Sequence, residues 1–175
     1  MDSRLVPPQP VGRDGWQRIE VPESMILGES FVSGDPHSSR LRVAYFVHEN
    51  DHTLHARAWF GKGAQGPPGY AHGGSMAAVL DEAMGIAAFL AGHPVVAASI
   101  GVNFHKSLPL GLDACVSTWV EQVEGKKIAT RGRLYFEDTG EDFATSEGLF
   151  IVQPIERFRD FMHMRNRVVK GTEQQ

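Results

Sequence analysis

The sequence contains a single cysteine, no excess of basic charge and no long uncharged apolar run. Because Cys115 is the only cysteine among 175 residues, an intrachain disulfide is excluded and a reducing, cytoplasmic setting is expected. Asp and Glu outnumber Lys and Arg by 21 to 17, so the formal net charge of −4 gives no reason to expect nucleic acid as a partner. No charge-free apolar run reaches the roughly 18 residues of a membrane span, and the start, MDSRLVPPQP, lacks the apolar core of a signal peptide. We therefore expect no membrane partner.

Two further absences narrow the possible chemistry. The nucleophile elbow GxSxG does not occur, which disfavours a hydrolase with a Ser-His-Asp triad. His48, His52 and His55 are close in sequence, but spacings of four and three across a turn do not bring three imidazoles to one face. We therefore expect no metal site.

What is present predicts one domain with an extension at each end. Pro, Gly, Ser and Asp are frequent in the first 39 residues, and we assign 1–30 to an N-terminal extension. Within it, the stretch DGWQRIEVPESMIL is expected to form either a short helix or an edge strand. Residues 31–153 form the domain, and IERFRDFMHMRNRVVK, within 154–175, predicts an amphipathic C-terminal helical tail.

Segments rich in apolar, β-branched and aromatic residues alternate with turns in the domain. They predict six strands and one long helix over 73–91, and this helix is apolar on nearly every side. The order β-β-α-β-β-β-β indicates an α+β fold, in which an antiparallel sheet of about six strands wraps round one long central helix. The expected strands are 41–49, 52–61, 95–108, 113–124, 126–138 and 142–153.

The stretch GYAHGGSMAAVLDEAMG, residues 69–85, contains the main candidate functional residues. Gly73 and Gly74 stand at the predicted helix start, where backbone N–H groups lack intrahelical acceptors and the helix dipole adds positive charge. Such an end suits a phosphate, a carboxylate or a carbonyl that becomes an oxyanion. Two acids interrupt the apolar helix. Glu82 fits a position that faces solvent, whereas Asp81 is expected to face a polar pocket, because an unpaired buried carboxylate is costly.

Gly73 and Asp81 are too far apart on one helix to act on one group. At about 1.5 Å per residue, the eight positions between them amount to roughly 12 Å. A two-fold dimer with antiparallel helices would bring the Gly73 end of one chain beside Asp81 of the other. We therefore expect a homodimer with two shared sites.

A family resemblance rests on three segments, which are GPPGYAHGGSMAAVLDEAMG (66–85), KSLPLG (106–111) and VEGKKIATRGRLYF (123–136). Together they resemble the hotdog-fold acyl-CoA thioesterases of the PaaI-like branch, over about residues 31–152. The resemblance implies a sheet wrapped round a central helix, in subunits that form dimers and often tetramers. It also implies that His72 positions the loop, that Gly73 N–H binds the thioester carbonyl with Gly74 beside it, and that Asp81 acts as nucleophile or as general base. Both roles of Asp81 stay open.

The sequence departs from the family pattern at one position. Members often carry Thr or Ser on the strand after the helix, and the corresponding residue here is Ala97. Because residues two apart on a strand share a face, Ser99 is expected to substitute, roughly 6.6 Å further along, with Asn103 on the same face. The phosphates of coenzyme A are expected near the basic residues Lys106, Lys126 and Lys127.

Three functions are compatible with these residues. The leading hypothesis is hydrolysis of an acyl-CoA thioester to free acid and coenzyme A, with no cofactor beyond the coenzyme A of the substrate. A hotdog dehydratase or hydratase would pair His72 with Asp81, but the loop glycines favour carbonyl activation. A non-catalytic module that binds acyl-CoA is the third, and the missing hydroxyl at Ala97 favours it.

Overall fold

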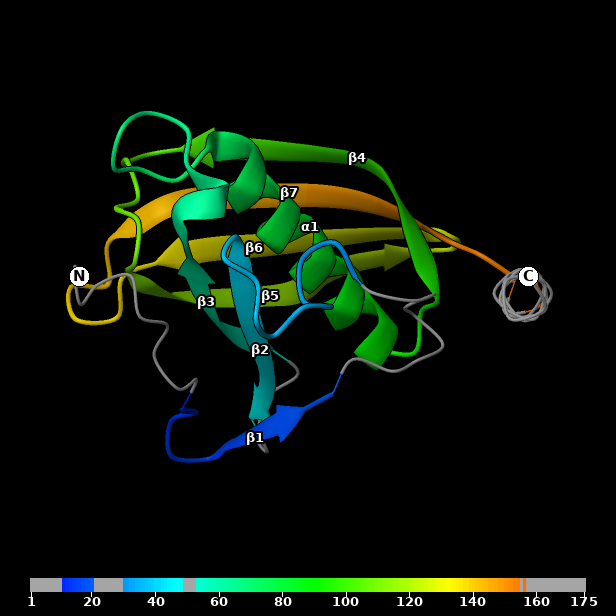
Figure 1. The fold of residues 1–175 in the computed structure, drawn as a ribbon. Coiled ribbons are helices and arrows are strands. Elements are labelled where there is room, and N and C mark those ends of the chain that lie inside the picture. Colours follow the sequence, from blue (N-terminus) through cyan, green and yellow to red (C-terminus); the bar gives the residue numbers. More distant parts are fainter. Residues whose placement is uncertain (1–10, 21–29, 49–52, 155, 157–175) are drawn as a thin grey trace, which may run out of the picture.

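The computed structural model describes residues 11–20, 30–48, 53–154 and 156, and shows one sheet wrapped round one helix (Figure 1). The sheet has the strand order β1-β2-β3-β5-β6-β7-β4, and every neighbouring pair is antiparallel. The expected α+β arrangement is confirmed, with seven strands in place of about six. The elements are β1 (Trp16–Ile19), β2 (Leu41–His48), β3 (Leu54–Phe60), the short 3-10 helix η2 (Lys62–Ala64), α1 (Gly73–Leu90), β4 (Val95–Phe104), β5 (Asp113–Glu124), β6 (Lys127–Tyr135) and β7 (Asp142–Val152).

The central helix α1 lies in the hollow of the curved sheet (Figure 1). It contacts β3, β4, β5, β6 and β7, and the side chains of Val79, Leu80, Ala83 and Met84 are fully buried. By length and apolar composition alone, α1 would suit a membrane span. In this fold the helix packs against five strands of the sheet, which accounts for its apolar composition.

Small residues let the helix approach the sheet closely. A Cβ on Gly132 would stand 2.9 Å from the Thr118 Cγ2 and 3.3 Å from the Leu80 Cδ2, in an interior that has no room for it. The Thr118 hydroxyl also donates to the Ala83 carbonyl of α1 at 3.1 Å. The sheet therefore fixes the rotation of the helix, and with it the direction in which Asp81 points.

A segment of the N-terminal extension builds the first edge of the sheet. β1 pairs with β2 along its whole length, from Trp16 opposite His48 to Ile19 opposite Tyr45. The Trp16 ring also stacks on His55, with the ring centroids 4.4 Å apart. Of the two structures expected for this segment, the edge strand is the one present, and it accounts for the seventh strand.

The strand expected over 95–108 ends at Phe104, because the chain turns back toward the start of α1. The Leu108 carbonyl accepts a hydrogen bond from the Ala71 N–H at 2.8 Å. The segment after β4 thus supports the loop before the helix. The helix predicted within 154–175 lies outside the described residues, which include only positions 154 and 156 of that tail.

Candidate active site

The loop that enters α1 is held by backbone hydrogen bonds on two sides. The His72 N–H donates to the Ala64 carbonyl and the Ala71 N–H donates to the Leu108 carbonyl, both at 2.8 Å. Gly66 packs so closely against this loop that a Cβ on it would stand 2.8 Å from the His72 Cα. These contacts give the first residue of the helix a fixed position.

His72 is the N-cap of α1. Its backbone is extended, with φ −69° and ψ 138°, and its Nδ1 accepts a hydrogen bond from the Gly74 N–H at 2.9 Å. This hydrogen bond occupies the lone pair of Nδ1. The Ser75 hydroxyl donates to the His72 carbonyl at 2.6 Å. His72 therefore organises the helix start, and its part in catalysis stays a prediction.

The Gly73 N–H has no acceptor among the described residues, whereas the Gly74 N–H donates to His72. An open donor at the positive end of an 18-residue helix is well placed for an oxygen that gains negative charge. A Cβ on Gly73 would stand 3.2 Å from the Phe104 Cζ. The geometry thus favours Gly73 over Gly74 as the donor to a ligand, with an aromatic ring beside it.

Asp81 is half-buried and forms no hydrogen bond or ion pair with the part of the chain that the structure describes. Burial raises the pKa of its carboxyl group, and the charge of neighbouring Glu82 raises that pKa further. A carboxylate with free oxygens and a raised pKa suits proton abstraction or nucleophilic attack.

Glu82, the second acid of the helix, is held inside the molecule. The Tyr45 hydroxyl donates to its Oε1 at 2.8 Å, and the Ser30 hydroxyl donates to its Oε2. The expectation that Glu82 faces solvent is therefore wrong. Its partners lie 37 and 52 residues away in the chain, so the only signal in the sequence was the general rule that a buried acid needs a partner.

A β-bulge in β4 decides where Ser99 lies. Ala97 is paired with Phe150, but Ser99 is paired with Leu149, so the register shifts between them. Phe150 packs with Met84 of α1, which places Ala97 on the helix side of the sheet and Ser99 on the outer side. The expectation that Ser99 shares a face with Ala97 is wrong, because the extra residue of the bulge breaks the alternation.

Asn103 lies on the same outer side as Ser99. It is paired with Thr145, and it lines a hollow of about 410 Å³ together with residues such as Trp119 and Arg131. Within one protomer, the structure therefore brings neither Ser99 nor Asn103 to the side of the sheet that holds Asp81. Their assignment to the substrate gains no support from this placement.

The three lysines predicted near the coenzyme A phosphates lie at two ends of the sheet. Lys106 follows β4, near the helix start, and forms an ion pair with Glu141. Lys126 and Lys127 are exposed at the turn between β5 and β6. Residues 144–151 of β7 run between the two ends, which corresponds to roughly 23 Å of strand. One protomer therefore cannot place all three lysines on the same phosphate.

Of the three histidines near the β2–β3 turn, the structure describes His48 and His55. His55 Nδ1 lies 3.0 Å from the Ser117 hydroxyl, and His52 falls outside the described residues. In the ranges that the structure describes, no group of three or more His, Cys, Asp and Glu side chains is arranged to hold a metal ion.

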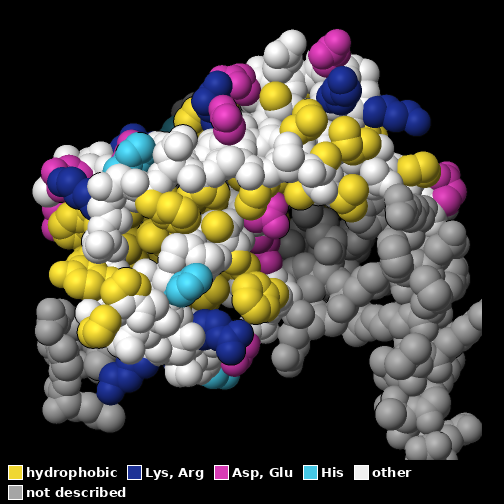
Figure 2. Space-filling view, turned by 90° about the horizontal axis from the view of Figure 1, so that it is seen from above, with side chains coloured by type: hydrophobic (Ala, Val, Ile, Leu, Met, Phe, Trp, Pro, Cys, Tyr) yellow, Lys and Arg dark blue, Asp and Glu magenta, His cyan; other side chains and the backbone are white. Residues whose placement is uncertain are grey.

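The second edge of the sheet, β4, is exposed and apolar. β4 is paired with β7 on one side only, and Val96, Ile100 and Phe104 are 45%, 39% and 52% exposed. Figure 2 looks onto this side of the molecule and shows hydrophobic side chains gathered across it. Open backbone groups beside exposed apolar side chains make this edge a candidate interaction surface.

Comparison with known sequences points to one family. Residues 68–142 match the family model of the thioesterase superfamily. The acyl-coenzyme A thioesterase THEM5 of Mus musculus is 34% identical over 92 residues, which cover 53% of this chain and 37% of that protein. The chain thus spans well under two thirds of the length of this relative.

Solved structures share the fold. RHA08564, a thioesterase superfamily protein, superposes with a TM-score of 0.60 and 29% identity, over 63% of this chain and 53% of that one. The smu.793 protein of Streptococcus mutans, solved with acetyl CoA, superposes with a TM-score of 0.56 and 16% identity. The match covers 61% of this chain and 86% of that one. The PaaI protein of E. coli superposes with a TM-score of 0.58 and 12% identity, over 64% of this chain and 80% of that one. The last two show the fold alone, and the expected PaaI-like hotdog fold is confirmed.

Proposed function

We propose that this chain hydrolyses acyl-CoA thioesters to a free acid and coenzyme A, because residues 68–142 match the family model of the thioesterase superfamily. One observation carries the proposal: the open Gly73 N–H at the helix start is combined with the unpaired, half-buried carboxylate of Asp81 on the same helix. Thioester hydrolysis needs both groups, because a donor must stabilise the oxyanion and a base or nucleophile must begin the attack.

In this proposal the Gly73 N–H donates a hydrogen bond to the thioester carbonyl oxygen. Asp81 then removes a proton from water, whose oxygen attacks the carbonyl carbon, or attacks that carbon itself to form a mixed anhydride that water hydrolyses. In both routes the C–S bond breaks, coenzyme A leaves as a thiol after it takes up a proton, and the acyl group becomes a free acid. Coenzyme A is part of the substrate, and no further cofactor takes part.

We propose further that two copies of the chain share each site. The roughly 12 Å between Gly73 and Asp81 along α1 prevents one helix from supplying both groups to one carbonyl. The open, apolar edge of β4 supports a second copy joined there by a two-fold axis, which completes two equivalent sites. Such a homodimer can pair again into a tetramer. A cytoplasmic location belongs to the proposal, since the single thiol of Cys115 needs no oxidising compartment.

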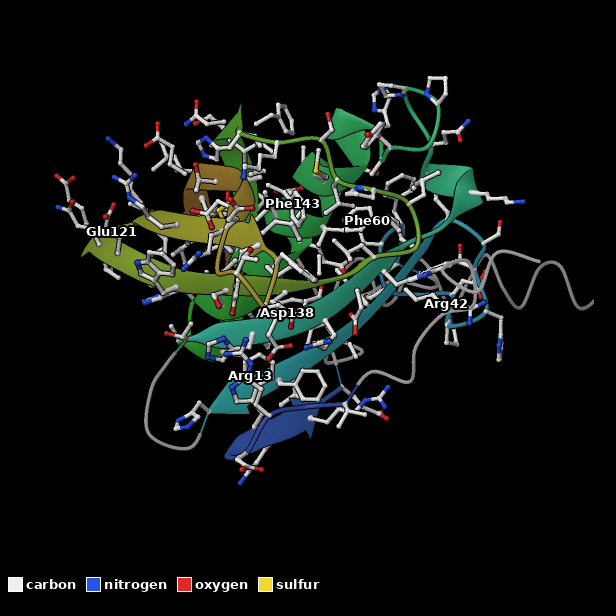
Figure 3. The ribbon with its side chains drawn as sticks, turned by 90° about the vertical axis from the view of Figure 1, so that its left-hand side faces the viewer. Arg13, Arg42, Phe60, Glu121, Asp138 and Phe143 are labelled. Atoms are coloured by element: carbon white, nitrogen blue, oxygen red, sulfur yellow. The ribbon has the colours of Figure 1, made fainter. Side chains whose placement is uncertain are left out.

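The proposal is tested by measuring the free thiol released from short, long and aromatic acyl-CoA esters. We expect turnover by the parent chain and a fall in kcat of about 10²–10⁴-fold for Asp81→Asn, the range seen when a general base is lost. Asp138→Asn is the matched control, because Asp138 is exposed in the turn between β6 and β7 (Figure 3). Full turnover by Asp81→Asn would refute the assigned role.

A non-catalytic acyl-CoA-binding module is the second candidate. It is favoured by the methyl side chain of Ala97 on the helix side of β4, where relatives often carry a hydroxyl, and by the bulge that turns Ser99 away. Binding of acyl-CoA esters, measured by calorimetry, with no thiol release from any of them would favour this candidate over hydrolysis.

A further inference from the structure

The two neighbouring acids of α1 have opposite surroundings. Asp81 has no partner among the described residues, whereas Glu82 accepts hydrogen bonds from Tyr45 on β2 and from Ser30 in the turn before it. The side chain of Tyr45 is only 2% exposed, so this part of the contact is shielded from water. Three separate segments of the chain therefore meet at Glu82, one residue from the proposed attacking group.

Both partners of Glu82 are donors, and neither is a cation. The Ser30 oxygen accepts from the Val32 and Ser33 N–H groups at 3.2 and 3.3 Å, which directs its own proton toward Glu82. Burial raises the pKa of Tyr45 well above its usual value, and the charge of Glu82 raises it further, so Tyr45 keeps its proton and remains a donor. The Glu82 carboxylate is thus held by two O–H donors, and no cation of the described residues pairs with it.

The charge of Glu82 acts on Asp81. An ionised carboxylate on the adjacent residue makes the loss of a proton from Asp81 less favourable. Of the charged groups in the described chain, Glu82 on the same helix is the one that shifts Asp81, and Tyr45 of β2 is the titratable group that faces Glu82. A carboxylate that binds its proton more tightly is also a better general base near neutral pH.

We propose that Glu82 is a positioning residue for the reaction, in which its charge, held in place by Tyr45 and Ser30, makes Asp81 a stronger base. This inference rests on the proposed function, because it says how Asp81 is tuned for the attack. Glu82 itself touches neither the thioester nor the attacking water. Its effect on the rate passes through Asp81 alone.

The test is the pH dependence of kcat/KM for thioester hydrolysis in the full chain. Glu82→Gln removes the charge but keeps the shape and can still accept from Tyr45. Without that charge, Asp81 loses its proton at lower pH, so the active carboxylate persists into more acidic solution. We expect the acidic limb of the profile to move to lower pH, and the ratio of kcat/KM at about pH 5 to that at about pH 8 to rise several-fold.

Two more variants make the result specific. Glu121→Gln removes the same charge at the far end of β5 (Figure 3), where Glu121 pairs with the half-exposed Arg131, and should leave the profile unchanged. Ser30→Ala removes one of the two donors to Glu82. Because the charge of Glu82 stays and loses part of its compensation, the acidic limb should move in the opposite direction, to higher pH, by a smaller amount. This variant serves in place of Glu82→Gln should that one fail to fold, as judged by thermal melting.

The outcomes separate this inference from the proposed function. An unmoved acidic limb in Glu82→Gln and in Ser30→Ala, with Asp81→Asn inactive, would overturn the inference and leave the hydrolase intact. A loss in Glu82→Gln as deep as that in Asp81→Asn would also overturn it, because Glu82 would then be an attacking group itself. A fully active Asp81→Asn would instead overturn the role assigned to Asp81.

Discussion

The two edges of the sheet are built in opposite ways. At the first edge, β1 covers β2. On the same side of the molecule, further into the sheet, Arg57 of β3 forms ion pairs with Asp113 of β5 and with Glu137, and Arg13, just before β1, also pairs with Glu137. At the other edge, β4 has no neighbouring strand on its outer flank among the described residues, and it carries exposed apolar side chains. One edge is closed by the chain's own residues, whereas the other is open to a partner.

The difference separates the groups that stabilise the fold from those assigned to the reaction. The half of the sheet behind the closed edge contains charges that pair with one another. The Gly73 N–H, the exposed Phe104 ring and the β4 edge are all on the open side and lack partners within the described chain. Unsatisfied groups that persist in a fold are candidates for binding or catalysis. Substitutions on either side of the sheet test whether stability and activity depend on different edges.

The largest effect is expected from a charge on the open edge. Ile100→Lys places an ammonium group on an apolar surface that we propose is buried between two copies, where an unpaired charge is costly. We expect monomers and loss of most activity, because each site needs both copies. Light scattering and thiol release at the same protein concentrations measure the two effects. Val11→Lys, the same kind of change at a residue 70% exposed near β1, should alter neither. A fully active Ile100→Lys monomer would contradict the shared site.

A smaller loss is expected when a methyl group is added at the helix start. In Gly73→Ala the new Cβ presses on the Phe104 ring, 3.2 Å away, and displaces the open N–H from the carbonyl oxygen. We expect kcat to fall about tenfold, less than when an oxyanion donor is removed. Phe104→Leu in the same chain makes room and should restore part of the rate. A double-mutant cycle measures this coupling, and strict additivity would show that the ring does not limit the position of Gly73.

In the half of the sheet behind the closed edge, the expected loss is in stability. Arg57 is 17% exposed and holds two carboxylates, so Arg57→Met leaves Asp113 and Glu137 without their shared cation. We expect the free energy of unfolding in urea to fall by about 2–4 kcal/mol, near the range for a broken buried pair. The rate per folded molecule should not change. Arg131→Met is the control, since the half-exposed ion pairs of Arg131 should contribute little to stability.

Asp81→Asn should stabilise the fold while it removes activity. The pKa of Asp81 is higher in the folded state than its ordinary 3.8, so the folded protein binds this proton more tightly than the unfolded chain does. The parent therefore gains stability as the pH falls through the folded pKa, and carries an unfavourable buried charge above it. Thermal melts should show a higher Tm for the variant at neutral pH and a smaller difference in acid. A lower Tm at neutral pH would mean that Asp81 has a stabilising partner.

The smallest effect is expected from Ser99→Ala. Because the bulge in β4 turns Ser99 to the outer side of the sheet, its hydroxyl cannot assist Asp81 of the same protomer. We expect kcat to stay at the parent value and stability to change by less than about 0.5 kcal/mol, as for most surface substitutions. A clear fall in kcat would show that the hydroxyl reaches a site in another copy.

Most of the secondary structure could be predicted from the sequence, and so could the residues proposed for the site. The apolar run that follows Gly73 and Gly74 predicted the helix to within a residue, because helix start signals and hydrophobic patterns are local. Strand patterns and turns predicted six of the seven strands for the same reason. The eight-residue spacing from Gly73 to Asp81 predicted that one helix cannot complete the site, because helix geometry converts sequence distance into length.

Tertiary structure decided what happens at single side chains. Glu82 turned inward because Tyr45 and Ser30 come to it from distant parts of the chain. Ser99 changed sides because the pairing of β4 with β7 absorbs one extra residue, which no period-two pattern in β4 reveals. Gly73 kept an open N–H while Gly74 did not, because the His72 ring folds back on the first turn. The outcomes at Glu82 and Ser99 depend on contacts between segments far apart in the chain, which a local sequence pattern does not contain.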